Sequence, residues 1–92
     1  MQMKFQQNPR VEAAPLNEES ILFDPTGSKF FMLNSSSAFM WEKLASPISA
    51  QVLASQLCER FEGVSIEAAL ADVQTTLEQL RSMDLVLIAN VP

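Results

Sequence analysis

The sequence predicts a single α+β domain in which a small antiparallel sheet comes first and three helices follow. The chain has 92 residues, enough for one domain, and 48% of them are hydrophobic, as in globular proteins. Apolar residues follow a strand-like pattern from residue 10 to 34 and a helical pattern afterwards. A turn signal, Asp24-Pro25-Thr26-Gly27, separates two apolar runs in the first part. A sheet segregated from its helices in this way defines the α+β class.

The first part of the chain carries the expected strands. Residues 11–14 form a short extended piece that Pro15 ends, and two apolar, aromatic-rich runs occupy 20–24 and 28–33. In the turn between these runs, the aspartate can bond the following backbone, proline presets φ, and glycine permits φ above zero. We therefore expect a meander of two or three antiparallel strands.

Two helices are expected next. The first runs from 36 to 45, because the polar cluster 34–37 offers several N-cap residues before an apolar face. The second runs from 50 to 61, with Ser49 as its N-cap, and Gly63 is placed to end it.

A third helix is expected over residues 66–83, roughly 27 Å long at 1.5 Å per residue. Its apolar residues recur at steps of three and four and form one stripe: Ile66, Leu70, Val73, Leu77 and Leu80. The apolar piece 85–88 then packs back on the domain or adds a short strand. Residues 1–9 are polar and end in Asn-Pro, so we expect a flexible lead-in there, a domain over 10–88 and a tail over 89–92.

The charge of the chain argues against a nucleic-acid partner. The net charge is −5 with a pI near 4.4, and the 6 Lys and Arg residues are spread thinly from Lys4 to Arg81. A protein that binds nucleic acid needs a basic stripe to neutralise phosphates. The acidic residues are scattered too, and a solvated surface explains them.

The compartment expected from the sequence is the cytoplasm, without membrane association. No segment has the roughly 18 to 20 uninterrupted apolar residues of a membrane span, and the first residues lack the apolar run of a signal peptide. The single cysteine, Cys58, cannot form an internal disulfide, which fits a reducing compartment. We interpret Cys58 as a small buried hydrophobe, with a reactive thiol as the alternative.

Neither an enzyme nor a cofactor site is expected. The chain has no histidine, so the commonest general base and metal ligand is absent. One cysteine cannot form a zinc cluster, and the two glycines are too far apart for a phosphate loop. Ser35, Ser36 and Ser37 have no base to activate them and suit helix capping better.

The run 29–33 is the last strand of the expected meander, so one of its edges has no strand beside it. Its apolar residues, Phe30 to Leu33, leave neither face plainly polar, and only Lys29 guards the edge. Two interpretations stay open. Either the helices and the tail cover the strand, or an extended peptide adds beside it as a further strand. An open edge can also pair with a second copy of the chain and give a homodimer.

The expected third helix offers a second wall for such a peptide. Its stripe centres on Ile66, Leu70 and Leu77, and one flank is a solvent face: Glu67, Gln74, Glu78 and Arg81. The other flank is small and largely apolar with one carboxylate, as a peptide groove would be: Ala69, Asp72, Thr76, Leu80 and Met83. Packing of this flank against another helix is the alternative.

Several of these pieces recur in a familiar order over residues 8–88. The chain opens with Asn8-Pro9-Arg10-Val11, and the turn at 24–27 and the run Phe31-Met32-Leu33-Asn34 follow. Positions on the helices and the last piece continue the pattern: Ser37, Ala38, Trp41, Leu44, Leu53, Leu57, Phe61, Asp72, Val73, Leu77, Leu80, Leu85 and Val86. The order and spacing resemble the PqqD-like family of peptide-recognition elements, which serve pathways of ribosomally made, post-translationally modified peptides.

The resemblance implies a winged-helix-like fold, a three-stranded antiparallel meander followed by three α-helices. It also implies a function as a non-catalytic peptide chaperone in natural-product or cofactor (PQQ-type) biosynthesis. Such a protein binds the leader segment of a precursor peptide beside its third strand and against its third helix. It then presents the precursor to a modifying enzyme such as a radical S-adenosylmethionine protein, a cyclase or a leader peptidase. Carried onto this chain, the peptide-binding residues are Lys29, Phe30, Phe31, Met32, Leu33, Ala69, Asp72, Val73, Thr76, Leu80 and Met83.

Two further points follow from the residues. Lys and Arg are scarcer here than in many members of the family, and Glu18, Glu19 and Asp72 favour a neutral or basic leader. The alternative from another class is a winged-helix DNA-binding or regulatory protein. Its third helix would read bases with Gln74, Gln79 and Arg81, although acids lie close to them in the sequence.

Overall fold

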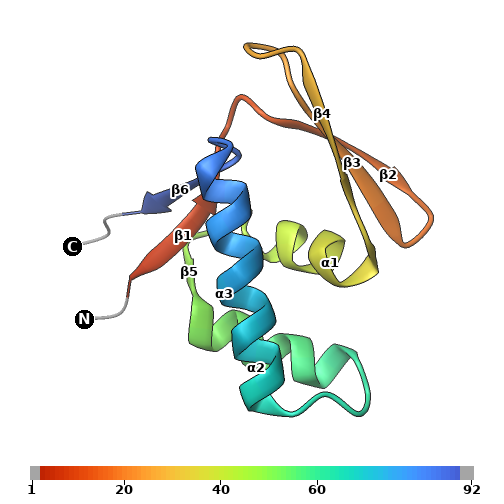
Figure 1. Ribbon diagram of the computed structural model, residues 1–92, viewed down its shortest axis with the longest axis vertical. Helices are drawn as coiled ribbons and strands as arrows, with labels where there is room; N and C mark the ends of the chain where they lie inside the picture. The colour runs from red at the N-terminus through yellow and green to blue at the C-terminus, as the bar shows by residue number, and fades with distance from the viewer. Residues whose placement is uncertain (1–2, 90–92) are drawn as a thin grey trace.

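The structure is a computed structural model that describes residues 3–89 of the chain. Its elements, coloured from red to blue along the chain in Figure 1, follow one another with short connections. In chain order they are β1 (Lys4–Gln7), β2 (Glu12–Leu16), β3 (Glu19–Asp24), β4 (Lys29–Leu33), α1 (Ser35–Lys43), β5 (Ile48–Ser49), α2 (Ala50–Arg60), α3 (Ile66–Ser82) and β6 (Val86–Ala89).

The expected meander is confirmed. Strands β2, β3 and β4 form an antiparallel sheet with β3 in the middle. The Asp24 side chain accepts a 3.0 Å hydrogen bond from the backbone N–H of Thr26, which is the turn contact expected of an aspartate there. With α1, α2 and α3 after it, this sheet gives the α+β fold that the sequence predicts.

The first strand of the meander differs in its bounds from the expected piece at 11–14. β2 continues through Pro15 to Leu16, and Pro15 lies opposite Ser20 in the sheet. Proline is tolerated because β2 is an edge strand, where one side of the backbone needs no ladder bond. Asn17, with a φ of 58°, lies in the tight turn that follows.

A second small sheet corrects the expected lead-in at 1–9. Strand β1 lies between β5 and β6 and pairs antiparallel with both. Phe5 packs against the core from this strand, so residues 4–7 belong to the folded domain. The expected tail at 89–92 begins on the last residue of β6. Residues 1, 2 and 90–92 lie outside the described residues.

The three helices begin at the residues that cap them. Asn34, Ser49 and Ser65 each accept a backbone N–H bond from the residue three positions later, as N-caps do. The Ser49 cap confirms the prediction for α2. α1 begins one residue earlier than expected because Asn34, rather than one of the serines, is its N-cap.

α3 buries most of its expected apolar stripe, since Val73, Leu77 and Leu80 are buried and Leu70 packs partly buried against the core. The departures are Ile66, which is 48% exposed, and Ala69, which is buried although it was expected on the groove flank. α3 packs mainly against α2, and the small Ala69 side chain permits a close approach there. No helix in residues 3–89 is long and apolar enough to cross a membrane.

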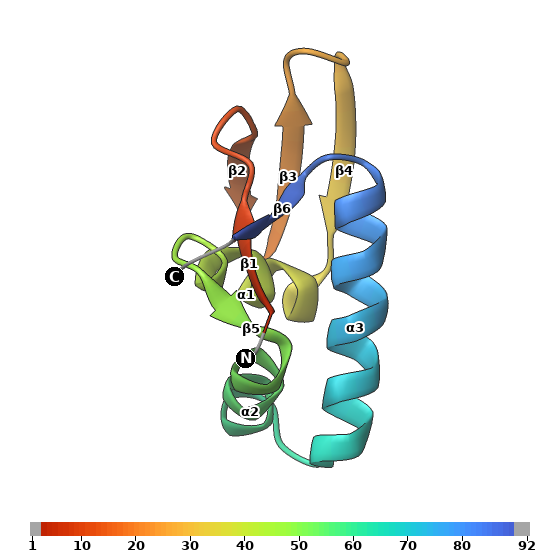
Figure 2. The same ribbon diagram turned by 90° about the vertical axis from the view of Figure 1, so that its left-hand side faces the viewer.

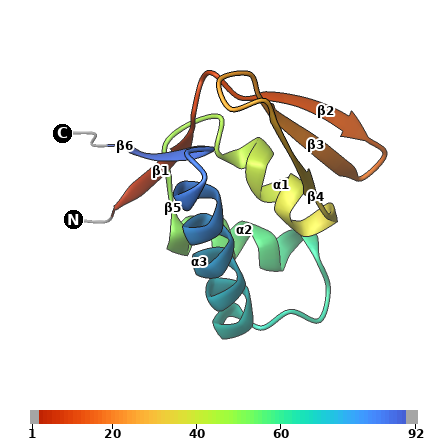
Figure 3. The same ribbon diagram turned by 45° about the horizontal axis from the view of Figure 1, so that its top comes forward.

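The meander has one covered face and one open face. α1 lies against it (Figure 3) and contacts β3 and β4, and Leu22 and Leu33 are buried on this inner face. Successive residues alternate between faces, so Phe30 and Met32 lie on the outer face with 72% and 61% of their surface exposed. The Phe30 ring packs at a tilt against its cross-strand neighbour Phe23, with centroids 4.8 Å apart.

Candidate functional site

The candidate site begins at the free edge of β4. Within residues 3–89, β4 pairs with β3 and with no other strand. β4 lies on the side of the meander that is closer to α3 (Figure 2), and residues from both elements line one groove. The edge carries no proline, in contrast to the edge of β2. Unpaired strand edges of this kind are templates for a further strand.

The position of Pro15 shows which backbone groups β4 turns toward its free edge. Pro15 has no N–H, so it and Ser20 cannot exchange two hydrogen bonds, and the backbone groups of Ser20 turn toward β4 instead. Ser20 lies opposite Leu33, and the pattern repeats every second residue. Leu33 and Phe31 therefore bond β3. The N–H and C=O groups of Phe30 and Met32 face outward.

A groove of about 460 Å³ lies between this edge and α3. Three parts of the fold line it. The sheet contributes Glu19, Phe31, Met32 and Leu33. The beginning of α1 contributes Asn34, Ser36, Ser37 and Met40. One face of α3 contributes Asp72, Thr75, Thr76 and Gln79, at helical spacings of three and four.

The structure brings together five of the residues predicted from the sequence. Phe31, Met32, Leu33, Asp72 and Thr76 line the groove from its two walls. These positions are the part of the predicted peptide-binding set that a ligand in the groove would meet.

The remaining predicted residues lie elsewhere. Ala69, Val73 and Leu80 are 0% exposed and pack in the core, so a surface ligand would not contact their side chains. This corrects the predicted flank of the helix, whose turn toward α2 buries these positions. Lys29 and Phe30 belong to β4 but lie outside the groove lining, and Met83, at the C-cap of α3, does too.

Sequence reasoning missed several groove residues. Thr75 lies three positions after Asp72, and Gln79 lies three positions after Thr76, so both share a helix face with the predicted groove residues. A correct prediction of which face of α3 is buried would have placed them beside the predicted wall. The polar residues that follow β4 were assigned to capping alone. Asn34 does cap α1, since its Oδ1 accepts bonds from the Ser37 N–H at 2.9 Å and the Ser36 hydroxyl at 3.0 Å.

The charged side chains that line the groove are all negative. Its lining includes two carboxylates, Glu19 and Asp72, and no lysine or arginine. Phe31 and Met32 supply apolar surface next to these groups. The arrangement can take an extended chain through backbone bonds to β4 and can contact its side chains through apolar, hydroxyl and carboxylate groups.

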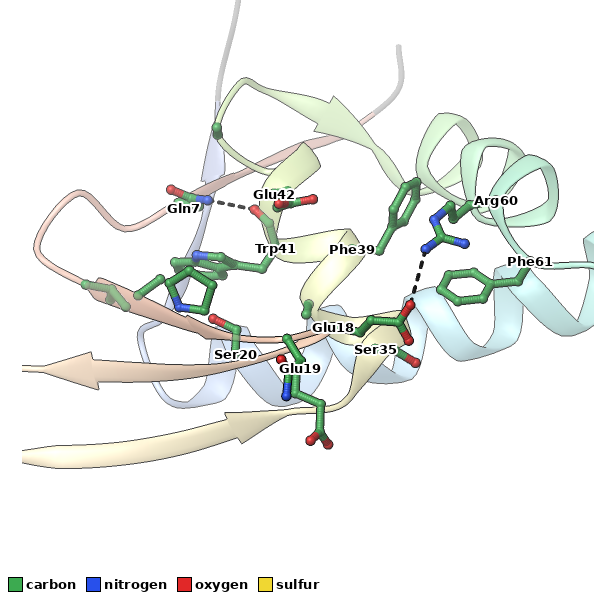
Figure 4. Close-up of a pocket in the computed structure, with 16 residues that line it drawn as sticks. Gln7, Glu18, Glu19, Ser20, Ser35, Phe39, Trp41, Glu42, Arg60 and Phe61 are labelled. Carbon is green, nitrogen blue, oxygen red and sulfur yellow. Dashed lines mark hydrogen bonds and ion pairs between the residues drawn. The ribbon is translucent and has the colours of Figure 1, made fainter.

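A larger hollow of about 690 Å³ lies at the opposite edge of the meander, between β2, α1 and the end of α2 (Figure 4). Several of its polar groups already have partners. Gln7 donates a 2.6 Å hydrogen bond to the Trp41 carbonyl oxygen, and Arg60 lies 4.0 Å from Glu18.

Two aromatic rings of this hollow already pack against neighbouring side chains. The Phe39 and Phe61 rings meet edge to face with centroids 5.9 Å apart, and Arg60 lies over the Phe61 ring at 5.0 Å. The adjoining sheet edge is β2, where Pro15 has no N–H to donate to an added strand. The groove at β4 is therefore the better candidate site.

Two further observations concern other kinds of site. Within residues 3–89, no three His, Cys, Asp or Glu side chains are grouped as a metal site would require. Gln74 and Arg81, expected to read bases in the DNA-binding alternative, line a different hollow from Gln79. The three side chains therefore do not share one recognition surface.

The meander, its free edge and the wall of α3 define a class of small α+β domain with a groove between a sheet edge and a helix. The family model of coenzyme PQQ synthesis protein D (PqqD) matches residues 19–86, which is well over half of the 92 residues, and the chain belongs to this family. No curated protein matches the chain.

Solved structures share the fold across nearly the whole chain. One is TbiB1 in complex with the TbiA(beta) leader peptide, at 16% identity and a TM-score of 0.80, with 95% of this chain and 98% of that chain covered. Another is lasso peptide synthetase B1 complexed with the leader peptide, at 22% identity and a TM-score of 0.78, with 90% and 96% covered. These similarities confirm the predicted fold and, with the family match, the predicted resemblance.

Proposed function

We propose that this domain binds the leader segment of a ribosomally made precursor peptide as a strand added to β4. The observation that carries the proposal is the free edge of β4 facing the wall of α3 across an open groove. An extended peptide there gains backbone bonds from the edge and selectivity from the groove side chains. The structural neighbours support the proposal, because both are complexes with leader peptides.

In this proposal the domain is a peptide chaperone without catalysis of its own. It holds the leader while a partner modifies the rest of the precursor, in the biosynthesis of a natural product or a PQQ-type cofactor. The partner is a modifying enzyme such as a radical S-adenosylmethionine protein, a cyclase or a leader peptidase, and the complex acts in the cytoplasm. Membership of the PqqD family favours this function over the DNA-binding alternative.

The test is a titration of the ¹⁵N-labelled chain with synthetic peptides that cover the N-terminal segments of short reading frames next to its gene, the candidates for a precursor. We expect the largest amide shifts at Phe30 and Met32, whose N–H groups face the free edge, and at Asp72 and Thr76 across the groove. The amides of β2 should move little, since β2 forms the opposite edge of the sheet. Shifts centred on β2, or none at all, would overturn the proposal.

A further inference from the structure

The α3 wall of the groove carries one charged side chain, and its charge is not balanced. Asp72 shares this wall with Thr75, Thr76 and Gln79. Within residues 3–89, Asp72 lies within 4.0 Å of no lysine or arginine nitrogen. The only other charge in the lining, Glu19, is of the same sign. A ligand in this groove therefore meets negative potential without a competing cation from the protein.

The beginning of α1 also lines the groove, and a helix N-terminus ordinarily attracts negative charge. Here a side chain of the protein itself already caps this N-terminus. The Asn34 side-chain oxygen accepts the Ser37 N–H at 2.9 Å and the Ser37 hydroxyl at 2.8 Å. Because this terminus is capped, the two carboxylates have the stronger effect on which ligand charge the groove favours.

Strand addition fixes which side chains of a bound peptide meet this wall. Residues directly opposite each other on neighbouring strands point to the same face of the sheet. A peptide residue opposite Phe31 therefore points to the inner face, as the groove residues Phe31 and Leu33 do, and toward the wall of α3, while Met32 lines the groove from the outer face. Its neighbours in the peptide, opposite Phe30 and Met32, point to the outer face, where those two side chains expose 72% and 61% of their surface.

We propose that the leader recognised by this chain carries a lysine or arginine at the position opposite Phe31, where its side chain reaches Asp72, between apolar residues that cover Phe30 and Met32. The inference rests on the proposed function and adds the sequence pattern of the peptide: apolar, basic, apolar. The basic residue sets selectivity, because a peptide with a glutamate at that position would place a third carboxylate in the groove.

The probe is a phage-displayed library of random twelve-residue peptides, selected against the immobilised full chain. We expect the selected peptides to carry a basic residue flanked by apolar ones. A labelled peptide from this pool should bind Asp72→Asn about two- to fivefold more weakly, the range of an exposed ion pair. A version of the peptide with glutamine at the basic position should bind Asp72→Asn and the unmodified chain equally.

The matched control is Glu78→Gln, which removes a carboxylate from the same helix but from a different hollow and should leave binding unchanged. Selected peptides that shift the amides of β4 but show no basic preference would overturn this inference and leave the proposed function standing. Peptides that bind without shifting the amides of β4, or a library from which none is selected, would overturn the proposed function and this inference with it.

Discussion

The side-chain amide of Asn8 donates a 2.7 Å hydrogen bond to the main-chain carbonyl of Asp84, 76 residues further along the chain. The Asn8 side-chain oxygen accepts the Arg10 N–H at 3.1 Å, and the Asn8 N–H bonds the Leu85 carbonyl at 3.0 Å. Asn8 is only 4% exposed, so water cannot easily replace these bonds. Asn8 therefore joins the connection between β1 and β2 to the turn between α3 and β6.

We expect Asn8→Ala to lower the free energy of unfolding by about 1–3 kcal/mol, because it leaves the partners of a buried amide unsatisfied. Urea denaturation measures this. Gln74→Ala is the control, since Gln74 is an exposed amide on α3, and its removal should change stability by less than about 0.5 kcal/mol. Equal stability of Asn8→Ala and the unmodified chain would show that the junction is not held by this side chain.

Local signals in the sequence predicted the meander and the helix starts well. The turn at Asp24 fixes the pairing of β3 with β4, since the two strands are neighbours in the chain. Ser49 and Ser65 begin their helices through bonds that span only three residues. One wall of the groove, the edge of β4, was predicted for the same reason.

Contacts between distant segments were not predictable in this way. β1 (Lys4–Gln7) carries one apolar residue, Phe5, among polar ones, and its strand depends on pairing with β5 and β6, which are distant in the sequence. The groove flank of α3 was misplaced because Ile66 looks like a core residue but is 48% exposed, while the small Ala69, expected on the flank, is buried. Hydrophobic periodicity measures size and polarity but not which face a neighbouring helix will cover.

The orientation of α3 can be tested with Leu80. Leu80 is 0% exposed, whereas Met83, from the same predicted flank, is 39% exposed. We expect Leu80→Ala to lower the free energy of unfolding by about 2–5 kcal/mol, as for other buried leucines. Met83→Ala should lower the free energy of unfolding by less than about 1 kcal/mol, because a truncated side chain at a partly exposed site leaves little buried cavity. Thermal denaturation measures both variants. Equal losses of stability in the two would contradict the assigned orientation of α3.

A set of proline variants tests strand addition at β4. Met32→Pro removes an N–H that faces the free edge, so we expect the fold to persist and leader binding to weaken roughly tenfold or more. Phe31→Pro removes an N–H that bonds β3 and should lower the free energy of unfolding by about 1–3 kcal/mol through that bond alone. Circular dichroism and calorimetric titration separate the two outcomes.

Two controls accompany the proline variants. Met32→Leu keeps the backbone N–H and a side chain of similar size, so it should bind the leader nearly as well as the unmodified chain. Ala13→Pro places a proline on the other edge of the sheet, two residues before Pro15 and with the same outward orientation of its nitrogen. It should fold and bind normally. Leader affinity that survives in folded Met32→Pro would argue against backbone pairing at β4.

Self-association and leader binding should exclude each other if both use the edge of β4. A second copy of the chain would pair with the outward backbone groups of Phe30 and Met32, which are the groups that the leader needs. We therefore expect saturating leader peptide to convert any dimer into a complex of one 10.2 kDa chain with one peptide, as measured by sedimentation velocity. Phe30→Lys, which adds charge beside this edge, should likewise weaken the dimer. A species with two chains and bound peptide would place the dimer contact elsewhere, since one strand edge accepts only one neighbour.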